Sequence, residues 1–115
     1  MKLLMIVDDE KDIRESVKLI LEKHNYKVVT AKDGDDCLEK LKKFKPDLIL
    51  MDIMMPGTPV KEVAEKIHGP KIAYLSILKR DDAERENMIS EDYAGYIQKP
   101  FEINQLVNSV NKLVA

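Results

Sequence analysis

Cysteine is almost missing from this chain of 115 residues, which contains a single one, Cys37. One thiol cannot form an internal disulfide, and it cannot supply the set of thiolates that a cysteine zinc site needs. Cys37 lies among residues that are compatible with a helix, which indicates a small residue in the core or at its boundary. The sequence therefore predicts a protein of a reducing compartment.

Long apolar runs are also missing. The longest run extends from Leu3 to Val7 and stops at three consecutive acidic residues, 8–10. A membrane-spanning helix needs about 20 apolar residues, and the core of a secretory signal peptide needs at least about 7. The sequence thus predicts a soluble, cytoplasmic protein without a membrane segment.

An excess of one charge sign is missing as well. Lys and Arg together number 19 and Asp and Glu number 21, which gives a formal net charge of -2. Such a balance provides no overall attraction to nucleic acid or to anionic lipid. We therefore expect no direct binding of nucleic acid or membranes, and partners that recognise local surface patches.

Short apolar runs alternate with segments of helical periodicity along the whole chain, and the length is that of one domain with one hydrophobic core. This alternation is typical of repeated βα units around a parallel sheet. The expected strands cover residues 3–7, 27–31, 47–52, 72–76 and 96–98, and the expected helices lie at about 11–24, around 38–41, around 63–67, at about 81–90 and at 103–114. The helix at 81–90 has few apolar residues, so we expect it to be the least firmly docked.

Reactive side chains collect where the predicted strands end. Asp8 and Asp9 end the first strand, Asp52 ends the third, Ser76 ends the fourth and Lys99 follows the fifth. In open parallel sheets, ligands bind beyond the carboxyl ends of the strands, where the strand order reverses. Three carboxylates that converge there repel one another unless a cation lies among them, and hard oxygen ligands suit Mg²⁺.

Each of these residues alone has an ordinary structural explanation, as a helix cap, a turn residue or a solvated charge. All five explanations would have to hold together at one edge of the sheet. The joint interpretation as a magnesium site is therefore favoured over five independent ones.

These residues belong to segments that resemble the receiver domains of two-component response regulators, and the resemblance covers almost the whole chain. The matching segments are residues 5–10, 46–57, Ser76 and 96–101. The family implies a flavodoxin-like (βα)5 three-layer sandwich with a five-stranded parallel sheet of order 2-1-3-4-5. It also implies that residues 1–115 form one receiver domain.

The resemblance implies specific roles for the acidic residues. Asp52 would be the phosphoacceptor, attacking the phosphohistidine of a partner kinase. Asp9 and Asp52 would ligate Mg²⁺ directly, together with the backbone carbonyl of Met54, whereas Asp8 would act mainly through a bound water. The chain would thus catalyse only its own phosphorylation and dephosphorylation, and would not be a conventional enzyme.

The family also implies roles for a cation, a hydroxyl and an aromatic ring. Lys99 would contact the phosphoryl oxygens, and its peptide bond to Pro100 would be cis. Ser76 would swing to hydrogen-bond the same oxygens, which frees space into which the Tyr96 ring turns. Ser76 and Tyr96 would therefore form the switch.

The partners follow from the same resemblance. A sensor histidine kinase or a histidine phosphotransfer protein would donate the phosphoryl group, and a downstream effector protein or domain would read the switch at the face of the fourth helix, fifth strand and fifth helix. Many receivers pair through that face, so a phosphorylation-dependent homodimer is compatible with the sequence.

Three positions depart from the family pattern. Ile77 stands where a small residue commonly follows the switch hydroxyl, Val60 stands where Gly is frequent, and Asp92-Tyr93 replace a Gly-Ala pair. Bulk at Ile77 could shield an acyl phosphate from water, so we expect slow dephosphorylation. The other two changes affect the third loop and the surface around the fourth helix.

The same residues argue against two other functions. A phosphatase with an aspartyl-phosphate nucleophile would need a second acidic residue two positions after Asp52, where Met54 stands. A flavin domain would need hydroxyls and free amides after the first strand, where residues 8–10 are acidic and would repel phosphate. The remaining alternative is a receiver-like interaction module that works without phosphorylation.

Overall fold

The computed structural model describes residues 1–115, in which five strands alternate with five helices. The strands are β1 (Leu3–Val7), β2 (Lys27–Ala31), β3 (Leu48–Met51), β4 (Lys71–Ser76) and β5 (Gly95–Gln98). The helices are α1 (Lys11–Glu22), α2 (Gly34–Lys40), α3 (Val60–Glu65), α4 (Arg80–Arg85) and α5 (Ile103–Leu113). None of these helices has the length and apolar character needed to cross a membrane.

All neighbouring strands are parallel, and their order is β2-β1-β3-β4-β5. This confirms the predicted flavodoxin-like α/β fold. The register pairs Val7 at the end of β1 with Met51 at the end of β3. Since Asp8 and Asp52 each follow these residues directly, the register brings them side by side at the carboxyl edge of the sheet.

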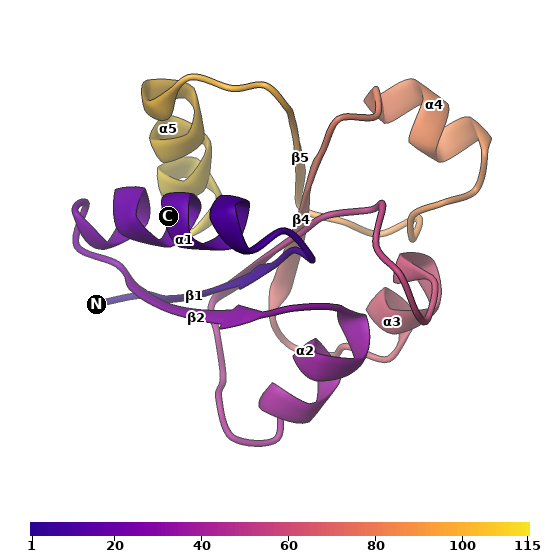
Figure 1. The fold of residues 1–115 in the computed structure, drawn as a ribbon, viewed down its shortest axis with the longest axis horizontal. Helices are drawn as coiled ribbons and strands as arrows, with labels where there is room; N and C mark the ends of the chain where they lie inside the picture. Colours follow the sequence, from indigo (N-terminus) through magenta and orange to yellow (C-terminus); the bar gives the residue numbers. More distant parts are fainter.

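The sheet is the middle of three layers, as Figure 1 shows, with α1 and α5 on one face and α2, α3 and α4 on the other. The strands are buried on both faces, so they are continuously apolar, and successive side chains alternate between the faces. In β1, Leu4 and Ile6 pack with α1 and α5, whereas Met5 and Val7 pack with the other three helices. Two hydrophobic clusters therefore hold the sheet rigidly under the edge that carries the acidic residues.

Helices α1 and α4 end before the residues at which the sequence predicts their ends, and each is followed by an Asn in the left-handed region. Asn25 has φ 68° and follows α1, which was expected to reach His24; Asn87 has φ 57° and follows α4, which was expected to reach Ser90. Asn tolerates this conformation better than most residues and so permits the chain to leave the helix.

Helix α4 buries only Ala83 among its own residues, and a tyrosine pair supports it from the side. The Arg80 guanidinium lies 5.2 Å from the centre of the Tyr93 ring and donates a hydrogen bond to its hydroxyl at 2.7 Å. Tyr93 in turn packs edge-on against the buried ring of Tyr74 in β4 at 5.6 Å. Tyr93, one of the departures from the family pattern, therefore connects α4 to the core.

Gly34, the first residue of α2, allows α2 to pack closely against α3. A Cβ atom built on Gly34 would lie 2.5 Å from Cγ2 of Val63, which is fully buried and β-branched. We expect Gly34→Ala to destabilise the fold by about 1–3 kcal/mol, because an overpacked core must shift its backbone. Urea denaturation measures this loss.

The matched control for this prediction is the double variant Gly34→Ala/Val63→Ala. Val63→Ala alone leaves a cavity, but it also makes room for the new methyl group, so the two losses should be clearly less than additive. Additive losses would contradict the role assigned to the Gly34–Val63 contact.

Candidate functional site

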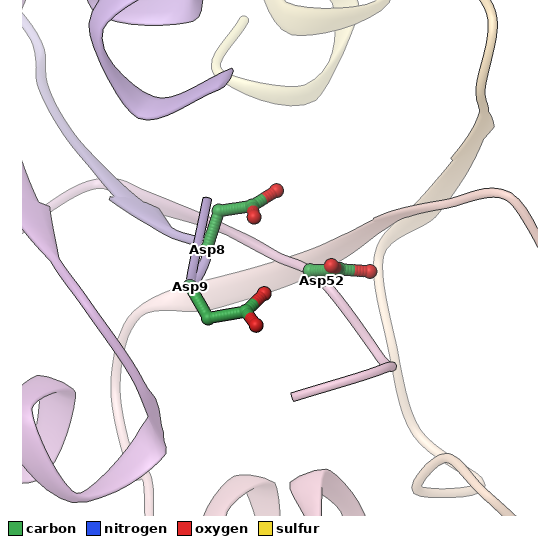
Figure 2. A group of neighbouring side chains, drawn as sticks. All are labelled: Asp8, Asp9 and Asp52. Carbon is green, nitrogen blue, oxygen red and sulfur yellow. The ribbon is translucent and has the colours of Figure 1, made fainter. Parts of the chain in front are cut away.

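Three carboxylates converge at the carboxyl edge of the sheet. One oxygen from each of Asp8, Asp9 and Asp52 lies within 4.8 Å of the others. Asp8 and Asp52 are buried, whereas Asp9 is exposed. Figure 2 shows the three side chains reaching to the same side of the strand ends, as the sequence predicts.

Lys99 is the cation of this cluster. Its Nζ lies 2.8 Å from Oδ2 of Asp8 and 3.7 Å from Oδ2 of Asp52, and its side chain is only 12% exposed. Its backbone N–H donates to the Ser76 carbonyl at 2.8 Å, which anchors the residue beside the end of β4. The peptide bond from Lys99 to Pro100 is cis, as the resemblance implies.

Backbone N–H groups hold the Asp52 carboxylate in place, but its surroundings disfavour the ionised form. The N–H groups of Ile53 and Met54 donate to its Oδ1 at 2.7 and 3.3 Å. Burial raises the pKa of Asp52 above its ordinary value, the Lys99 cation opposes this, and the neighbouring Asp8 carboxylate adds to it. A single lysine therefore does not balance the buried negative charge.

The cluster has the chemistry of a magnesium site. All its side-chain donors are carboxylate oxygens, which Mg²⁺ prefers, and the exposure of Asp9 leaves the site accessible from solvent. Burial, together with the Asp8 charge, raises the pKa of Asp52, and a divalent cation would offset both effects by favouring the ionised carboxylate. The residues present therefore fit Mg²⁺. Met54 lies two residues after Asp52, and its backbone carbonyl remains an expected ligand.

The predicted switch residues lie next to this cluster and share one partner. Ser76, at the end of β4, is fully buried, and its Oγ accepts a hydrogen bond from the Leu78 N–H at 3.3 Å. The Tyr96 hydroxyl, on the neighbouring strand, donates to the Leu78 carbonyl at 2.6 Å. Burial raises the pKa of Tyr96, and interaction with the Ser76 hydroxyl partly offsets the rise. Leu78 therefore connects the two residues.

Three features of the site were not predicted from the sequence. The Arg14 guanidinium, on α1, donates to the backbone carbonyl of Asp8 at 2.7 Å, and Lys99 pairs with Asp8 more closely than with Asp52. The sequence signal that could have indicated the Arg14 bond is a basic residue in the first turn of the helix that follows Asp8 and Asp9. The amide donors to Asp52 had no sequence signal, because every residue except proline has a backbone N–H.

The positions that depart from the family pattern differ in their surroundings. Ile77, beside Ser76, is 67% exposed. Val60 is buried in the core, where it begins α3. Asp92 is exposed.

Comparison with known proteins agrees with this geometry. Residues 4–111 match the response regulator receiver domain family. The chain is 35% identical over 113 residues to the transcriptional regulatory protein ResD of Bacillus subtilis, covering 96% of this chain and 47% of ResD. It is 32% identical over 115 residues to the alkaline phosphatase synthesis transcriptional regulatory protein PhoP of the same organism, covering 95% of this chain and 48% of PhoP. The chain therefore spans less than half the length of these two relatives.

One solved structure shares the fold and about a third of the aligned residues. The response regulator TrrA of Thermotoga maritima, solved in complex with Mg²⁺ and beryllofluoride, superposes with a TM-score of 0.83 and 32% sequence identity. The match covers 98% of this chain and 99% of TrrA. Fold, acidic cluster and relatives agree, and the chain belongs to the response regulator receiver domain family.

Proposed function

We propose that this receiver domain takes a phosphoryl group from the phosphohistidine of a sensor kinase or phosphotransfer protein onto Asp52. Mg²⁺ would be held directly by Asp9, Asp52 and the Met54 carbonyl, and by Asp8 mainly through a bound water. The observation that carries the proposal is the convergence of the three carboxylates within 4.8 Å beside the buried Lys99. The binding of Mg²⁺ and beryllofluoride by the related TrrA supports it.

The step at Asp52 is a single displacement at phosphorus. A carboxylate oxygen of Asp52 forms the new O–P bond while the P–N bond to the donor imidazole breaks, and the released imidazole takes a proton from solvent. The amides of Ile53 and Met54 hold the carboxylate in place, so little reorganisation is needed. Bound Mg²⁺ would supply positive charge to the phosphoryl oxygens.

Lys99 and Ser76 would then respond to the product. The Lys99 ammonium group would move away from the Asp8 carboxylate and contact the new phosphoryl oxygens, because the phosphoryl group carries more negative charge than a carboxylate. The Ser76 hydroxyl turns toward the same oxygens and leaves the Leu78 N–H. Since Tyr96 bonds the carbonyl of Leu78, the change reaches the face formed by α4, β5 and α5.

The remaining assignments rest on family membership. We propose that residues 1–115 act as one receiver unit. Phosphoryl transfer would take place in the cytoplasm, where receiver domains are typically found. The face formed by α4, β5 and α5 would deliver the signal to an effector protein or domain. Phosphorylation-dependent pairing of two copies through the same face is part of this proposal, and size measurement with and without beryllofluoride tests it.

Intact-mass spectrometry after incubation with Mg²⁺ and acetyl phosphate tests the proposed chemistry. We expect wild-type protein to gain the mass of one phosphoryl group, Asp52→Asn to gain none, and chelation of Mg²⁺ to prevent the gain. Asp92→Asn, which removes an exposed carboxylate outside the site, is the matched control and should gain the group normally. Wild type that stays unmodified, or Asp52→Asn that is modified equally, would favour a phosphorylation-independent interaction module.

Ile77 should slow the loss of the phosphoryl group. Ile77 directly follows Ser76, and Met54 lies two residues after Asp52; their apolar side chains are 67% and 51% exposed. We propose that these two side chains limit the approach of water to the acyl phosphate. We expect Ile77→Ala to shorten the half-life of the phosphorylated protein severalfold, measured by the decay of the phosphoprotein mass after removal of the donor. Ile103→Ala, which removes an exposed apolar side chain from α5, is the control. An unchanged half-life for Ile77→Ala would contradict the shielding role.

A further inference from the structure

The β1–α1 turn carries two of the three acidic residues, and a single arginine of α1 holds it. Arg14 is partly buried, and its Nη1 donates to the backbone carbonyl of Asp8 at 2.7 Å. The Arg14 backbone N–H also bonds the Glu10 carbonyl at 3.0 Å, so the same residue contacts both ends of the turn.

The turn is otherwise fixed only through Asp8. Its N–H donates to the Ala31 carbonyl, and its carboxylate accepts from the Glu10 N–H at 2.9 Å and from Lys99. The next residue, Asp9, is exposed, and its carboxylate takes part in no hydrogen bond or ion pair. The position of Asp9 near Asp8 and Asp52 therefore depends on the backbone of the turn.

The charge of Arg14 acts in the opposite direction from its hydrogen bond. The guanidinium bonds the Asp8 backbone and not a carboxylate, but a cation on this turn still lowers the attraction of the acidic cluster for a further cation. Removal of the charge alone would therefore tighten Mg²⁺ binding. Loss of the hydrogen bond would instead free the Asp8 carbonyl and loosen the turn, which would weaken Mg²⁺ binding. The two effects have opposite signs and can be separated.

We propose that Arg14 is a positioning residue for the metal site: its bond to the Asp8 carbonyl fixes the β1–α1 turn so that the Asp9 carboxylate is presented to Mg²⁺ together with Asp8 and Asp52. The inference rests on the proposed function and adds to it a residue outside the direct ligands. Groups that orient metal ligands commonly alter metal affinity by about 10-fold to 100-fold when they are removed.

Calorimetric titration with Mg²⁺ tests the inference on Arg14→Met, which keeps most of the aliphatic stem and loses the donors. We expect the dissociation constant for Mg²⁺ to rise about tenfold, while the unfolding temperature in the absence of metal falls by only a few degrees, as expected for the loss of one hydrogen bond. Arg14→Lys, which keeps the charge and one donor group, should restore most of the affinity. At Mg²⁺ concentrations far above both constants, the rates of phosphorylation by acetyl phosphate should converge.

Lys11→Ala is the matched control, because Lys11 is an exposed cation of the same helical turn that pairs only with Glu15, at 3.9 Å. Its Mg²⁺ affinity should stay the same or rise slightly. Unchanged or tighter binding by Arg14→Met would overturn the inference. If Arg14→Met does not fold, Arg14→Gln, which is neutral and shorter than Arg, carries the same expectation. Wild type that binds no Mg²⁺ would instead contradict the proposed function itself.

Discussion

Replacing Lys99 by Met should destabilise the metal-free protein by about 3 kcal/mol or more, since removal of one partner from a buried ion pair leaves an uncompensated charge. Lys99 lies within 4 Å of both Asp8 and Asp52, whose side chains are only 2% and 9% exposed. A loss of this size is a large part of the total stability of a small domain. Urea denaturation at neutral pH without divalent ions measures it.

The loss in Lys99→Met should shrink in two conditions. Added Mg²⁺ supplies the missing positive charge. A lower pH protonates Asp52, which removes the negative charge; in the wild type, burial raises the pKa of Asp52 and the Lys99 cation opposes this rise. Lys42→Met is the control, because Lys42 forms an exposed pair with Glu39 at 3.1 Å and should change stability by less than about 1 kcal/mol. Equal losses in the two variants would contradict a buried counter-ion role for Lys99.

Replacing Asp52 by Asn should abolish phosphorylation and yet raise the unfolding temperature of the metal-free protein by several degrees. Burial raises the folded-state pKa of Asp52, so the folded state holds this proton more tightly than the unfolded state does. Stability from this group is therefore present at low pH and is lost as the pH rises through the raised pKa. At neutral pH the ionised carboxylate costs stability, and the neutral amide removes that cost.

The pH dependence separates this prediction from a general effect of the substitution. Thermal unfolding of wild type and Asp52→Asn without divalent ions should differ at pH 7.5, and the difference should vanish near pH 3, where Asp52 is protonated in both states. Mg²⁺ should then stabilise wild type more than Asp52→Asn, because binding to the folded state alone raises stability. A less stable Asp52→Asn at neutral pH would contradict the electrostatic account of the pocket.

The sheet and the acidic cluster followed from residue type and order. Continuous apolar runs such as 48–51 predicted buried parallel strands, and the acidic residues directly after two of these strands predicted a common edge. Parallel pairing of Val7 with Met51 then brings Asp8 and Asp52 together, which is the arrangement observed. These features depend on periodicity and strand ends, which a sequence displays directly.

The support around the cluster was less accessible from the sequence. Amide donors to Asp52 depend on the backbone course of the β3–α3 loop, and the Arg14 bond depends on the angle at which α1 leaves the sheet. The link from Arg80 through Tyr93 to the core joins residues whose proximity only the packed fold defines. The early end of α4 at Asn87 likewise reflects one backbone conformation, which composition does not specify.

A crystal structure of the protein with Mg²⁺ and beryllofluoride tests the central claim most directly. The account predicts beryllium bonded to a carboxylate oxygen of Asp52, the metal ion ligated by Asp9, Asp52 and the Met54 carbonyl, and Lys99 in contact with a fluoride. Beryllofluoride on another residue, or a metal ion bound away from Asp9 and Asp52, would contradict it.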